Sequence, residues 1–357
     1  MLLTIAIPTY NRCQFLADLL ESIRREWKDE YNGLCEVMVI DNASPDNTPA
    51  VVEKYAQLLP LRSIRNPQNL GLQGNWRECI RNAQGTYLWI IGDDEEVATH
   101  SIDHILRVIQ GDQPAVIIGN YHYESEQRPL FLQSVRGKPL TEGPANTAEF
   151  VSTHGLLWTF GNYGMVVGRV DLVRAKLEVE PQYFESNFAQ VFFYYEAFHQ
   201  ETLYFCHKAF FVTDEDAQGP NKERWKTDGT IREWFAVPRS MELMLPRCHP
   251  EHPRRPLTFF NFCSNDWLPM WIGLYRRGFQ GTGFEPDESL ACIAASKRLV
   301  DLVDPTVFTE LLKSNLWELN HTYRVAKELL ANRNELCQRL MELSHETVLI
   351  RSIELPQ

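Results

Sequence analysis

Apolar runs alternate with amphipathic helical stretches along the first half of the chain. Leu3–Ile7 and Val37–Ile40 are short and mostly apolar, and Leu61–Ile64 is a weaker run of the same kind. A fourth run, Tyr87–Ile91, is continuously apolar, which is typical of a strand buried on both faces. Between these runs, apolar residues recur every three or four positions. The order predicts a mainly parallel α/β sheet flanked by helices.

Local signals place the helices and the later strands. Asn11, with Gln14 three residues on, is predicted to cap the first helix. Thr48 begins the second, because Pro49 suits the first turn of a helix. Residues 123–148 are rich in proline and glycine and are expected to form a surface excursion. The other predicted elements are helices over Ile102–Ile109, from Asp171 and over Asn187–Glu201, and strands over Ala115–Ile118, Tyr163–Val167 and Leu203–Val212.

The pattern changes after a polar break at Thr213–Asn221. We therefore expect one α/β domain over 1–215 and a mainly helical C-terminal region over 216–357. A heptad-like stripe between Leu312 and Leu330 is open to two interpretations, packing onto the first domain or an oligomer interface. The aromatic segment Asn265–Phe279 has two as well, an amphipathic surface-seeking stretch or packing between the domains.

Composition narrows the class of protein. The 357 residues carry a formal net charge of -12, which argues against a nucleic-acid partner, since such a surface needs a basic face. No apolar run approaches the ~18 residues of a membrane-spanning helix, and the first residues resemble a strand rather than a signal peptide. The scattered cysteines have no CxxC spacing, so we expect neither a zinc site nor a disulfide framework. This cysteine usage fits a reducing cytoplasm.

Four consecutive carboxylates, Asp93–Glu96, follow the continuous apolar run and Gly92. Adjacent carboxylates repel one another, and hard cations such as Mg²⁺ and Mn²⁺ prefer carboxylate oxygen. The carboxyl end of a buried parallel strand is also where open α/β sheets bind ligands. A solvated acidic turn is the alternative, and the neighbouring loops favour a metal site.

Two more polar loops, Pro8–Arg12 and Asp41–Ser44, are expected at the same edge of the sheet. In order, Ile-Pro-Thr-Tyr-Asn-Arg, Val-Ile-Asp-Asn-Ala-Ser, Asn-Leu-Gly and the acidic turn closely resemble the inverting family 2 glycosyltransferases with the GT-A fold. The resemblance covers roughly residues 1–212 and is to the kind that builds bacterial surface glycans.

The resemblance implies that 1–215 is a nucleotide-sugar-binding and catalytic domain that uses Mn²⁺ or Mg²⁺. The family's Asp-X-Asp metal motif matches Asp93-Asp94-Glu95, with Glu in the third position. Asp94 is then the expected metal ligand, with Glu95 or Glu96 assisting. The residues expected to bind the nucleotide-sugar are Pro8, Thr9, Tyr10, Arg12, Asp41, Asn69, Asn75 and Asp93. A turn cap is the alternative for Asp41, and loop formation is the alternative for the two asparagines.

Family members of this kind also use a carboxylate that deprotonates the acceptor hydroxyl, placed at the start of a helix after the acceptor loop. Glu185 fits this description, although no second acid adjoins it, and Glu196 and Asp214 are the alternatives. Trp158 and Phe160 are expected either beside the acceptor or in the core.

The expected reaction is transfer of a sugar to a glycan or lipid-linked glycan. A sugar nucleotidyltransferase is one alternative, disfavoured because the turn Pro8–Arg12 has no glycine. A non-catalytic sugar-nucleotide-binding scaffold is another, left open by the lone Glu185. A dehydrogenase is disfavoured by the lack of G-x-G-x-x-G. We expect a cytoplasmic protein, with peripheral association at the inner face of the cell membrane and homo-oligomerisation through the C-terminal helices as further expectations.

Overall fold

The computed structural model describes residues 1–123, 134–135, 138–154, 159–177 and 189–213. Nearly all of them lie in one compact unit, which comprises Met1–Phe150 and Leu157–Ala217. The heptad-like stripe and the aromatic segment Asn265–Phe279 lie outside the described residues. The predicted domain boundary at residue 215 and the helical character of 216–357 therefore stay predictions.

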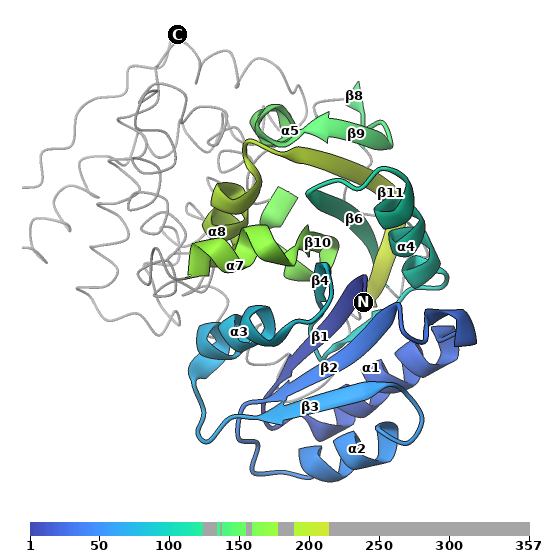
Figure 1. Cartoon of the computed structure of the whole chain (residues 1–357), viewed down its shortest axis with the longest axis vertical. Helices are drawn as coiled ribbons and strands as arrows, with labels where there is room; N and C mark the ends of the chain where they lie inside the picture. The colour runs from blue at the N-terminus through green and yellow to red at the C-terminus, as the bar shows by residue number, and fades with distance from the viewer. Residues whose placement is uncertain (124–133, 136–137, 155–158, 178–188, 214–357) are drawn as a thin grey trace, which may run out of the picture. The chain divides into compact units, whose positions relative to one another are not determined.

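Figure 1 labels the elements in chain order. The strands are β1 (Leu3–Thr9), β2 (Cys35–Asp41), β3 (Leu61–Arg65), β4 (Tyr87–Ile90), β5 (Glu95–Val97), β6 (Val116–Tyr123), β7 (Ser134–Val135), β8 (Lys138–Pro139), β9 (Gly143–Asn146), β10 (Val166–Arg169) and β11 (Thr202–Thr213). The helices are α1 (Cys13–Glu26), α2 (Thr48–Tyr55), α3 (Gly71–Asn82), α4 (Ser101–Gly111), α5 (Thr147–His154), α7 (Val170–Leu177) and α8 (Ala189–Phe198), with 3₁₀ turns η1 (Asp29–Tyr31) and η2 (Tyr163–Met165).

One mixed sheet organises the unit, in the order β3-β2-β1-β4-β10-β6-β11-β5, with β9 paired to β11. The first four strands are parallel to one another. β10 runs antiparallel between β4 and β6, and β11 is parallel to β6. The predicted mainly parallel α/β sheet is thus confirmed, with antiparallel pairs at β10, β5 and β9.

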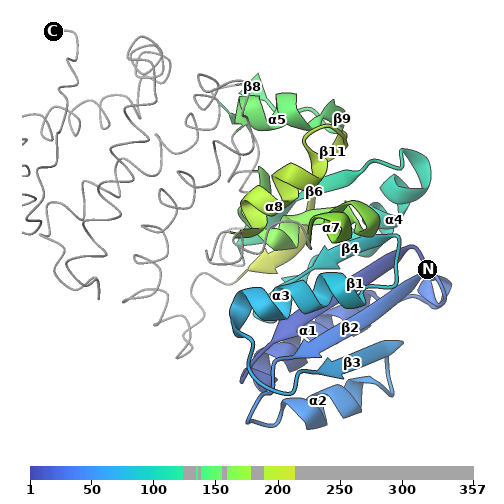
Figure 2. The ribbon, with the colours of Figure 1, turned by 60° about the vertical axis from the view of Figure 1, so that its left-hand side comes forward.

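The helices cover both faces of this sheet (Figures 1 and 2). The chain moves outward from β1 through α1 to β2 and through α2 to β3, and then returns through α3 to β4. Because right-handed crossovers in opposite directions lie on opposite faces, α3 packs across the sheet from α1 and α2. Trp76 of α3 makes an edge contact with Phe193 of α8, at 5.2 Å between ring centroids, which extends the α3 layer.

The central strand β4 explains the continuous apolar run. All four of its residues are buried, between β1 on one side and β10 on the other. Trp89 is fully buried, and its indole N–H donates a hydrogen bond to the Gly164 carbonyl at 2.7 Å. A strand with helices on both faces has no solvent face, so its sequence does not alternate.

Two predictions of local structure are wrong. Asn11 does not cap α1: its φ is 56°, in the left-handed region that asparagine tolerates, and the Cys13 N–H is satisfied instead by Asp46 Oδ2 at 2.9 Å. Glu95 and Glu96 begin strand β5, which pairs with β11, rather than completing a turn. The expected surface excursion is not contradicted: within it, Gly143–Asn146 forms the partly exposed strand β9 against the first residues of β11.

Cysteines pack as small apolar residues where the structure describes them. Cys35, Cys79 and Cys206 are buried thiols and Cys13 is half-buried. Burial raises the pKa of Cys35 to about 12, so this thiol is neutral and unreactive. None of these four cysteines forms a disulfide.

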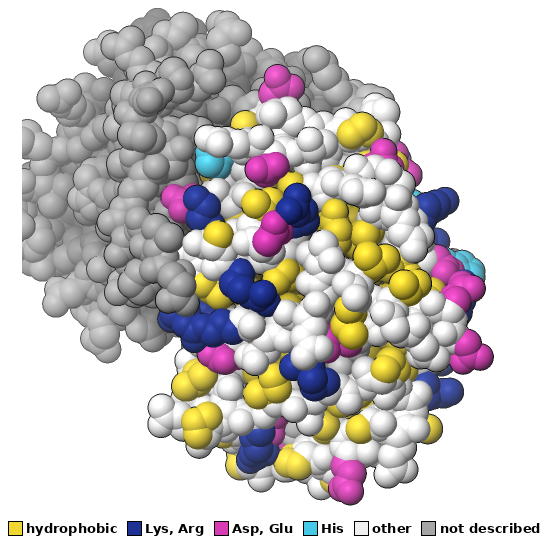
Figure 3. All heavy atoms as spheres, viewed as in Figure 1, with side chains coloured by type: hydrophobic (Ala, Val, Ile, Leu, Met, Phe, Trp, Pro, Cys, Tyr) yellow, Lys and Arg dark blue, Asp and Glu magenta, His cyan; other side chains and the backbone are white. Residues whose placement is uncertain are grey.

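The visible surface mixes both signs of charge. On the face shown in Figure 3, the Lys and Arg side chains of the described residues are interspersed with Asp and Glu. Across the same described ranges, no helix is both long and apolar enough to span a membrane.

Candidate functional site

Three loops meet at the carboxyl edge of the parallel strands. The register pairs Thr9 of β1 with Asp41 of β2, so the two strands end at the same level. β4 continues beside β1 past its last strand residue, since the Ile91 N–H donates to the Ala6 carbonyl at 3.0 Å. The acidic turn therefore passes directly over the end of β1, as expected for this edge.

Asp93 is the buried anchor of the acidic turn. It is 4% exposed, and its two carboxylate oxygens accept hydrogen bonds from Thr9 Oγ1 at 2.7 Å and from Arg12 Nη1 at 2.9 Å. Burial raises the pKa of the Asp93 carboxyl to about 6; the Arg12 charge opposes this rise and the neighbouring Asp94 charge adds to it. Thr9, Arg12 and Asp93, all expected at the site, are brought together.

Asp94 is the more accessible carboxylate of the turn. Its side chain is 28% exposed, and its Oδ2 lies 3.1 Å from the same Arg12 nitrogen that contacts Asp93. Gly92 leaves room for this side chain, because a Cβ at position 92 would come within 2.9 Å of Asp94 Oδ1 and the carboxylate would have to move. The accessible oxygens of Asp94 suit the metal-ligand role expected for it.

The next two acids point to different surroundings. Glu96 forms a 3.0 Å ion pair with Arg25 of α1, and both side chains are more than half exposed. Glu95 is half-buried, and its charge acts on the Tyr163 hydroxyl together with those of Asp93 and Asp94. Successive residues of a strand face opposite sides. Of the two candidate assistants to Asp94, Glu95 is the one on the side of the acidic turn.

Tyr163 is a neighbour of the acidic turn that the sequence did not reveal. Its hydroxyl lies 3.7 Å from the point where a Cβ on Gly92 would stand. Burial, followed by the charges of Asp94, Asp93 and Glu95, raises the pKa of Tyr163, so it remains a protonated donor at neutral pH. Because β10 runs antiparallel to β4, the residues before β10 return to the place where β4 ends.

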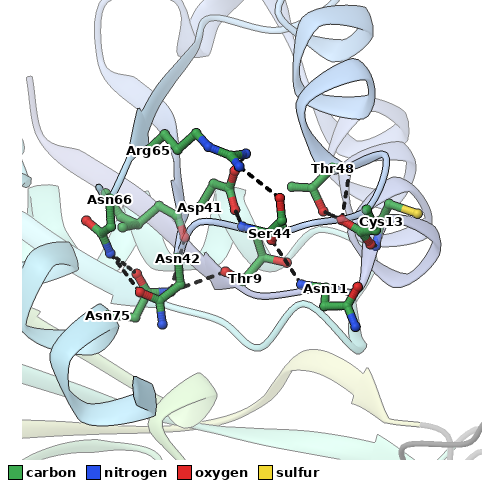
Figure 4. Close-up of polar contacts among 12 residues, drawn as sticks. Thr9, Asn11, Cys13, Asp41, Asn42, Ser44, Thr48, Arg65, Asn66 and Asn75 are labelled. Carbon is green, nitrogen blue, oxygen red and sulfur yellow. Dashed lines mark hydrogen bonds and ion pairs between the residues drawn. The ribbon is translucent and has the colours of Figure 1, made fainter. Parts of the chain in front are cut away.

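Asp41 makes the turn-capping contact that was one of its two expected roles. Its Oδ1 accepts the Ser44 N–H at 2.8 Å, and its Oδ2 pairs with Arg65 of β3 (Figure 4). Arg65 also donates to the Ser44 carbonyl at 2.9 Å, while the Ser44 hydroxyl accepts the Asn11 N–H at 2.9 Å. These bonds tie the loop after β2 to the loop after β1, and contact with a base or ribose stays a prediction for Asp41.

An asparagine network fastens the loop before α3. Asn75, 3% exposed, donates to the Ile40 carbonyl at 3.1 Å and accepts from Asn66 at 3.0 Å. Asn69 accepts from Asn42 at 2.8 Å. Asn42 and Asn66 were not among the predicted site residues, although Figure 4 shows both beside Asn75 and Thr9. Asn69 and Asn75 thus have loop-forming contacts, and their contact with a donor stays a prediction.

The remaining predicted residues differ in their positions. Pro8 is buried in β1, whereas Tyr10 is 42% exposed at the loop tip. Phe160 is fully buried, and its ring lies 5.9 Å from that of Tyr194, so it packs in the core. Glu196 is half-buried on α8. Glu185, Asp214 and Trp158 lie outside the described residues.

The carboxylates of the acidic turn could hold a divalent cation only together with oxygen atoms from a bound ligand. Across the described ranges, no three His, Cys, Asp or Glu side chains gather where they could hold a metal ion. Mg²⁺ is commonly held by one or two carboxylates together with substrate phosphates. Asp94 and Glu95 supply hard carboxylate oxygens of this kind, so a donor diphosphate would complete the site.

A family profile matches the part of the chain that builds this site. Residues 4–170 match the profile described as "Glycosyl transferase family 2". These residues are a family 2 glycosyltransferase domain.

The family 2 domain is 36% identical over 104 residues to the abequosyltransferase RfbV of Salmonella typhimurium, which is 29% of this chain and 31% of that protein. The glycosyltransferase GlyG of Streptococcus pneumoniae is 22% identical over 177 residues, 49% of this chain and 58% of that protein. The chain thus spans about a third to just over half of these curated relatives.

Solved structures share the fold of the family 2 domain. The crystal structure of Staphylococcus aureus TarS 1-349 has a TM-score of 0.59 at 15% identity, covering 93% of this chain and 92% of that one. A mannosyltransferase from Pyrobaculum calidifontis, solved with GDP-Man and Mn²⁺, has a TM-score of 0.53 at 15% identity, with 88% and 87% covered. This confirms the GT-A-like α/β fold expected from the sequence.

Proposed function

We propose that the chain is an inverting glycosyltransferase that moves a sugar from a nucleotide-sugar donor to a glycan or lipid-linked glycan. The observation that carries this proposal is the cluster of Thr9, Arg12, Asp93 and Asp94 at the carboxyl edge of a family 2 domain. Such an edge is where α/β sheets of this kind bind ligands. It combines a cation for phosphate with carboxylates for a metal.

The names of related proteins support a nucleotide-sugar donor. TarS has been solved in complex with UDP-GlcNAc, and the mannosyltransferase with GDP-Man and Mn²⁺. One relative is named as an abequosyltransferase and another as a poly(ribitol-phosphate) β-N-acetylglucosaminyltransferase. From these names we infer a nucleoside diphosphate sugar as donor and a surface polymer or lipid-linked glycan as acceptor.

The reaction assigns a task to each group at the edge. The acceptor oxygen bonds to the anomeric carbon as the bond from that carbon to the diphosphate breaks, and attack from the opposite face inverts the configuration. A divalent cation bound by Asp94 and Glu95 would neutralise charge on the departing diphosphate. Arg12 donates to phosphate oxygens, and Tyr10 stacks on the base. Asp93 keeps Arg12 and the turn in place through its buried hydrogen bonds.

The base is assigned to Glu185, with Glu196 and Asp214 next in line. Removing the proton from an acceptor hydroxyl contributes ~10²–10⁴-fold to rate. Glu185→Gln should therefore lower turnover at least about a hundredfold while donor affinity in Mn²⁺ stays nearly unchanged. Normal turnover would transfer the role to Glu196 or Asp214. Loss of donor binding would make Glu185 a structural residue.

Localisation and domain organisation complete the proposal. We infer a cytoplasmic protein from the cysteine usage, with a catalytic domain over 1–215 and a mainly helical region over 216–357. Peripheral membrane binding and self-association are assigned to that region. Flotation with anionic liposomes at low salt tests the first, and no binding of the purified protein rejects it. Sedimentation velocity over a range of protein concentrations tests the second.

A ligand screen tests the donor assignment. The full chain is heated with Mn²⁺ and a panel of UDP-, GDP- and CDP-sugars, because a true donor stabilises the folded state by mass action. At 100 times its dissociation constant, a ligand adds about 2.7 kcal/mol to the free energy of unfolding. We expect one nucleotide class to raise Tm for the wild type and to do so far less for Asp94→Asn. Failure of all donors would contradict the proposal.

A further inference from the structure

Arg12 bridges the two aspartates of the acidic turn with one nitrogen. Its Nη1 lies 2.9 Å from Asp93 Oδ1 and 3.1 Å from Asp94 Oδ2. Burial lowers the pKa of the guanidinium, but the charges of Asp93 and Asp94 more than offset this and raise it overall. Arg12 therefore stays charged and acts as a built-in cation at the position where the carboxylates would otherwise repel one another.

The two contacts of Arg12 differ in how firmly each partner is held. Asp93 has a side chain 6% exposed and a second donor, Thr9 Oγ1, at 2.7 Å. Asp94 has a side chain 28% exposed and the longer of the two contacts to Arg12. The contact with Asp94 is thus the one that can be exchanged while the contact with Asp93 holds Arg12 near the turn.

A metal ion and Arg12 would compete for the same oxygen. Asp94 is the expected metal ligand, and its Oδ2 is the atom that Arg12 contacts. With Arg12 in place, one of the two aspartate charges is offset, so Asp94 and Glu95 attract a dication less strongly than they would without the guanidinium. The described residues supply no third ligand nearby, so phosphate oxygens are needed to complete coordination.

We propose that Arg12 is a tethered counter-cation that exchanges partners during donor binding. It releases Asp94 to the metal and donates the freed N–H groups to the diphosphate, while its contact with Asp93 is kept. Metal and nucleotide then bind as a coupled pair, and metal alone binds poorly. This inference rests on the proposed function, since it needs a diphosphate donor and a divalent cation at this turn.

The test measures Mn²⁺ binding rather than turnover. Free Mn²⁺ is followed by electron paramagnetic resonance with the full chain, alone and with UDP, GDP or CDP. For the wild type, nucleotide should tighten Mn²⁺ binding at least about fivefold. Arg12→Met, which removes the competing charge, should bind Mn²⁺ alone more tightly than the wild type and show a smaller gain from nucleotide.

Arg25→Met is the matched control. It removes an arginine that pairs with Glu96 of the same acidic stretch, at 3.0 Å, but on its exposed side. Mn²⁺ affinity should be unchanged in this variant, with and without nucleotide. Equal tightening in Arg25→Met and Arg12→Met would reduce the effect to general charge and overturn the exchange.

A second variant separates the two roles of Arg12 and decides the matter if Arg12→Met does not fold. Arg12→Lys keeps a positive charge but lacks the fork that grips a diphosphate. It should bind Mn²⁺ alone like the wild type and lose most of the gain from nucleotide; a full gain would contradict the proposal. If the wild type binds neither Mn²⁺ nor any of the three nucleotides, the proposed function itself fails.

Discussion

The hydroxyl of Thr9 donates a hydrogen bond of 2.7 Å to the buried carboxylate of Asp93, a residue 84 positions further along the chain. The bond joins the end of β1 to the turn after β4. It holds Asp93 against the sheet, while the neighbouring Asp94 keeps a side chain that is 28% exposed. The acidic turn is therefore positioned by the first strand of the fold.

Thr9→Val should both destabilise the protein and weaken the donor site. The change keeps the shape of the side chain and leaves Asp93 Oδ2 without its donor, which costs about 1–3 kcal/mol for a buried group. Urea denaturation measures this loss, and nucleotide titration measures the second effect. Thr4→Val is the control, because Thr4 makes buried hydrogen bonds with Glu36 and Gly85 at the opposite end of β1. If both variants weaken nucleotide binding equally, the bond to Asp93 has no special role.

Gly92→Ala should impair Mn²⁺-dependent turnover through sterics alone. The new Cβ would meet Asp94 Oδ1 at 2.9 Å and displace the carboxylate. Steady-state kinetics over a range of Mn²⁺ concentrations should show a higher metal requirement. Gly111→Ala is the control: nothing lies within 4 Å of a Cβ there, and the change should stabilise the protein by ~0.4–1 kcal/mol without affecting turnover. An unaltered metal requirement in Gly92→Ala would contradict the assignment of Asp94.

Asn42→Asp should raise the KM for donor. The Asn42 amide donates to Asn69 Oδ1 at 2.8 Å and to the Gly71 carbonyl at 3.2 Å, and its oxygen accepts from the Leu70 N–H and from Asn66. A carboxylate at this position would still accept the hydrogen bonds from Leu70 and Asn66. Its second oxygen has no hydrogen to donate, so it would repel the Asn69 and Gly71 oxygens. We expect a loss of about 1–3 kcal/mol in stability and a displaced loop before α3.

Asn32→Asp is the comparison for that variant. Asn32 is an exposed residue that serves as an acceptor for the Trp27 indole N–H at 3.2 Å, and a carboxylate can do the same. It should leave both KM and Tm near the wild-type values. If Asn42→Asp also leaves the KM for donor unchanged, the asparagine network supports the fold and has no influence on the donor pocket.

Glu36 should make stability depend on pH in the acid range. Burial raises the pKa of this carboxyl, but hydrogen bonds from Arg62, Thr4 and the Gln84 N–H outweigh it and hold the pKa below the ordinary value of 4.5. A lowered folded-state pKa contributes stability above the unfolded pKa, and that contribution is lost as pH falls through the folded value. Glu36→Gln should therefore show a smaller fall in the free energy of unfolding between pH 6 and pH 3. An equally steep fall would assign the acid sensitivity to other groups.

The sequence sufficed for the elements that depend on local pattern. The apolar runs of β1, β2 and β4 and the loops after them are readable because a buried strand and its polar end are contiguous in the chain. The three-residue strand β5 was missed because Glu95 and Glu96 carry no strand signal, and β5 forms only through pairing with β11. Tyr163 was missed because it reaches the acidic turn through the antiparallel return of β10.

The asparagine network could not be predicted from the sequence for a different reason. Asn42 stands inside a motif that pointed to Asp41, and its own importance comes from using both amide hydrogens and both lone pairs. Which partners saturate an amide is decided by loops 24–29 residues away, so the residue type alone does not reveal it. The wrong cap at Asn11 has the same origin, since Asp46 from another loop supplies the bond.

The most direct test of the account is release of nucleoside diphosphate from the donor that stabilises the protein best. The rate is measured for the wild type and for Asp94→Asn, with acceptor present, in Mn²⁺ and in excess chelator. We predict metal-dependent turnover for the wild type and a loss of at least about a hundredfold both with chelator and in Asp94→Asn. The reason is that a bound metal lowers the activation barrier by several kcal/mol. Full turnover in excess chelator, or a fully active Asp94→Asn, would contradict the assignment of the acidic turn as the metal-dependent transfer site.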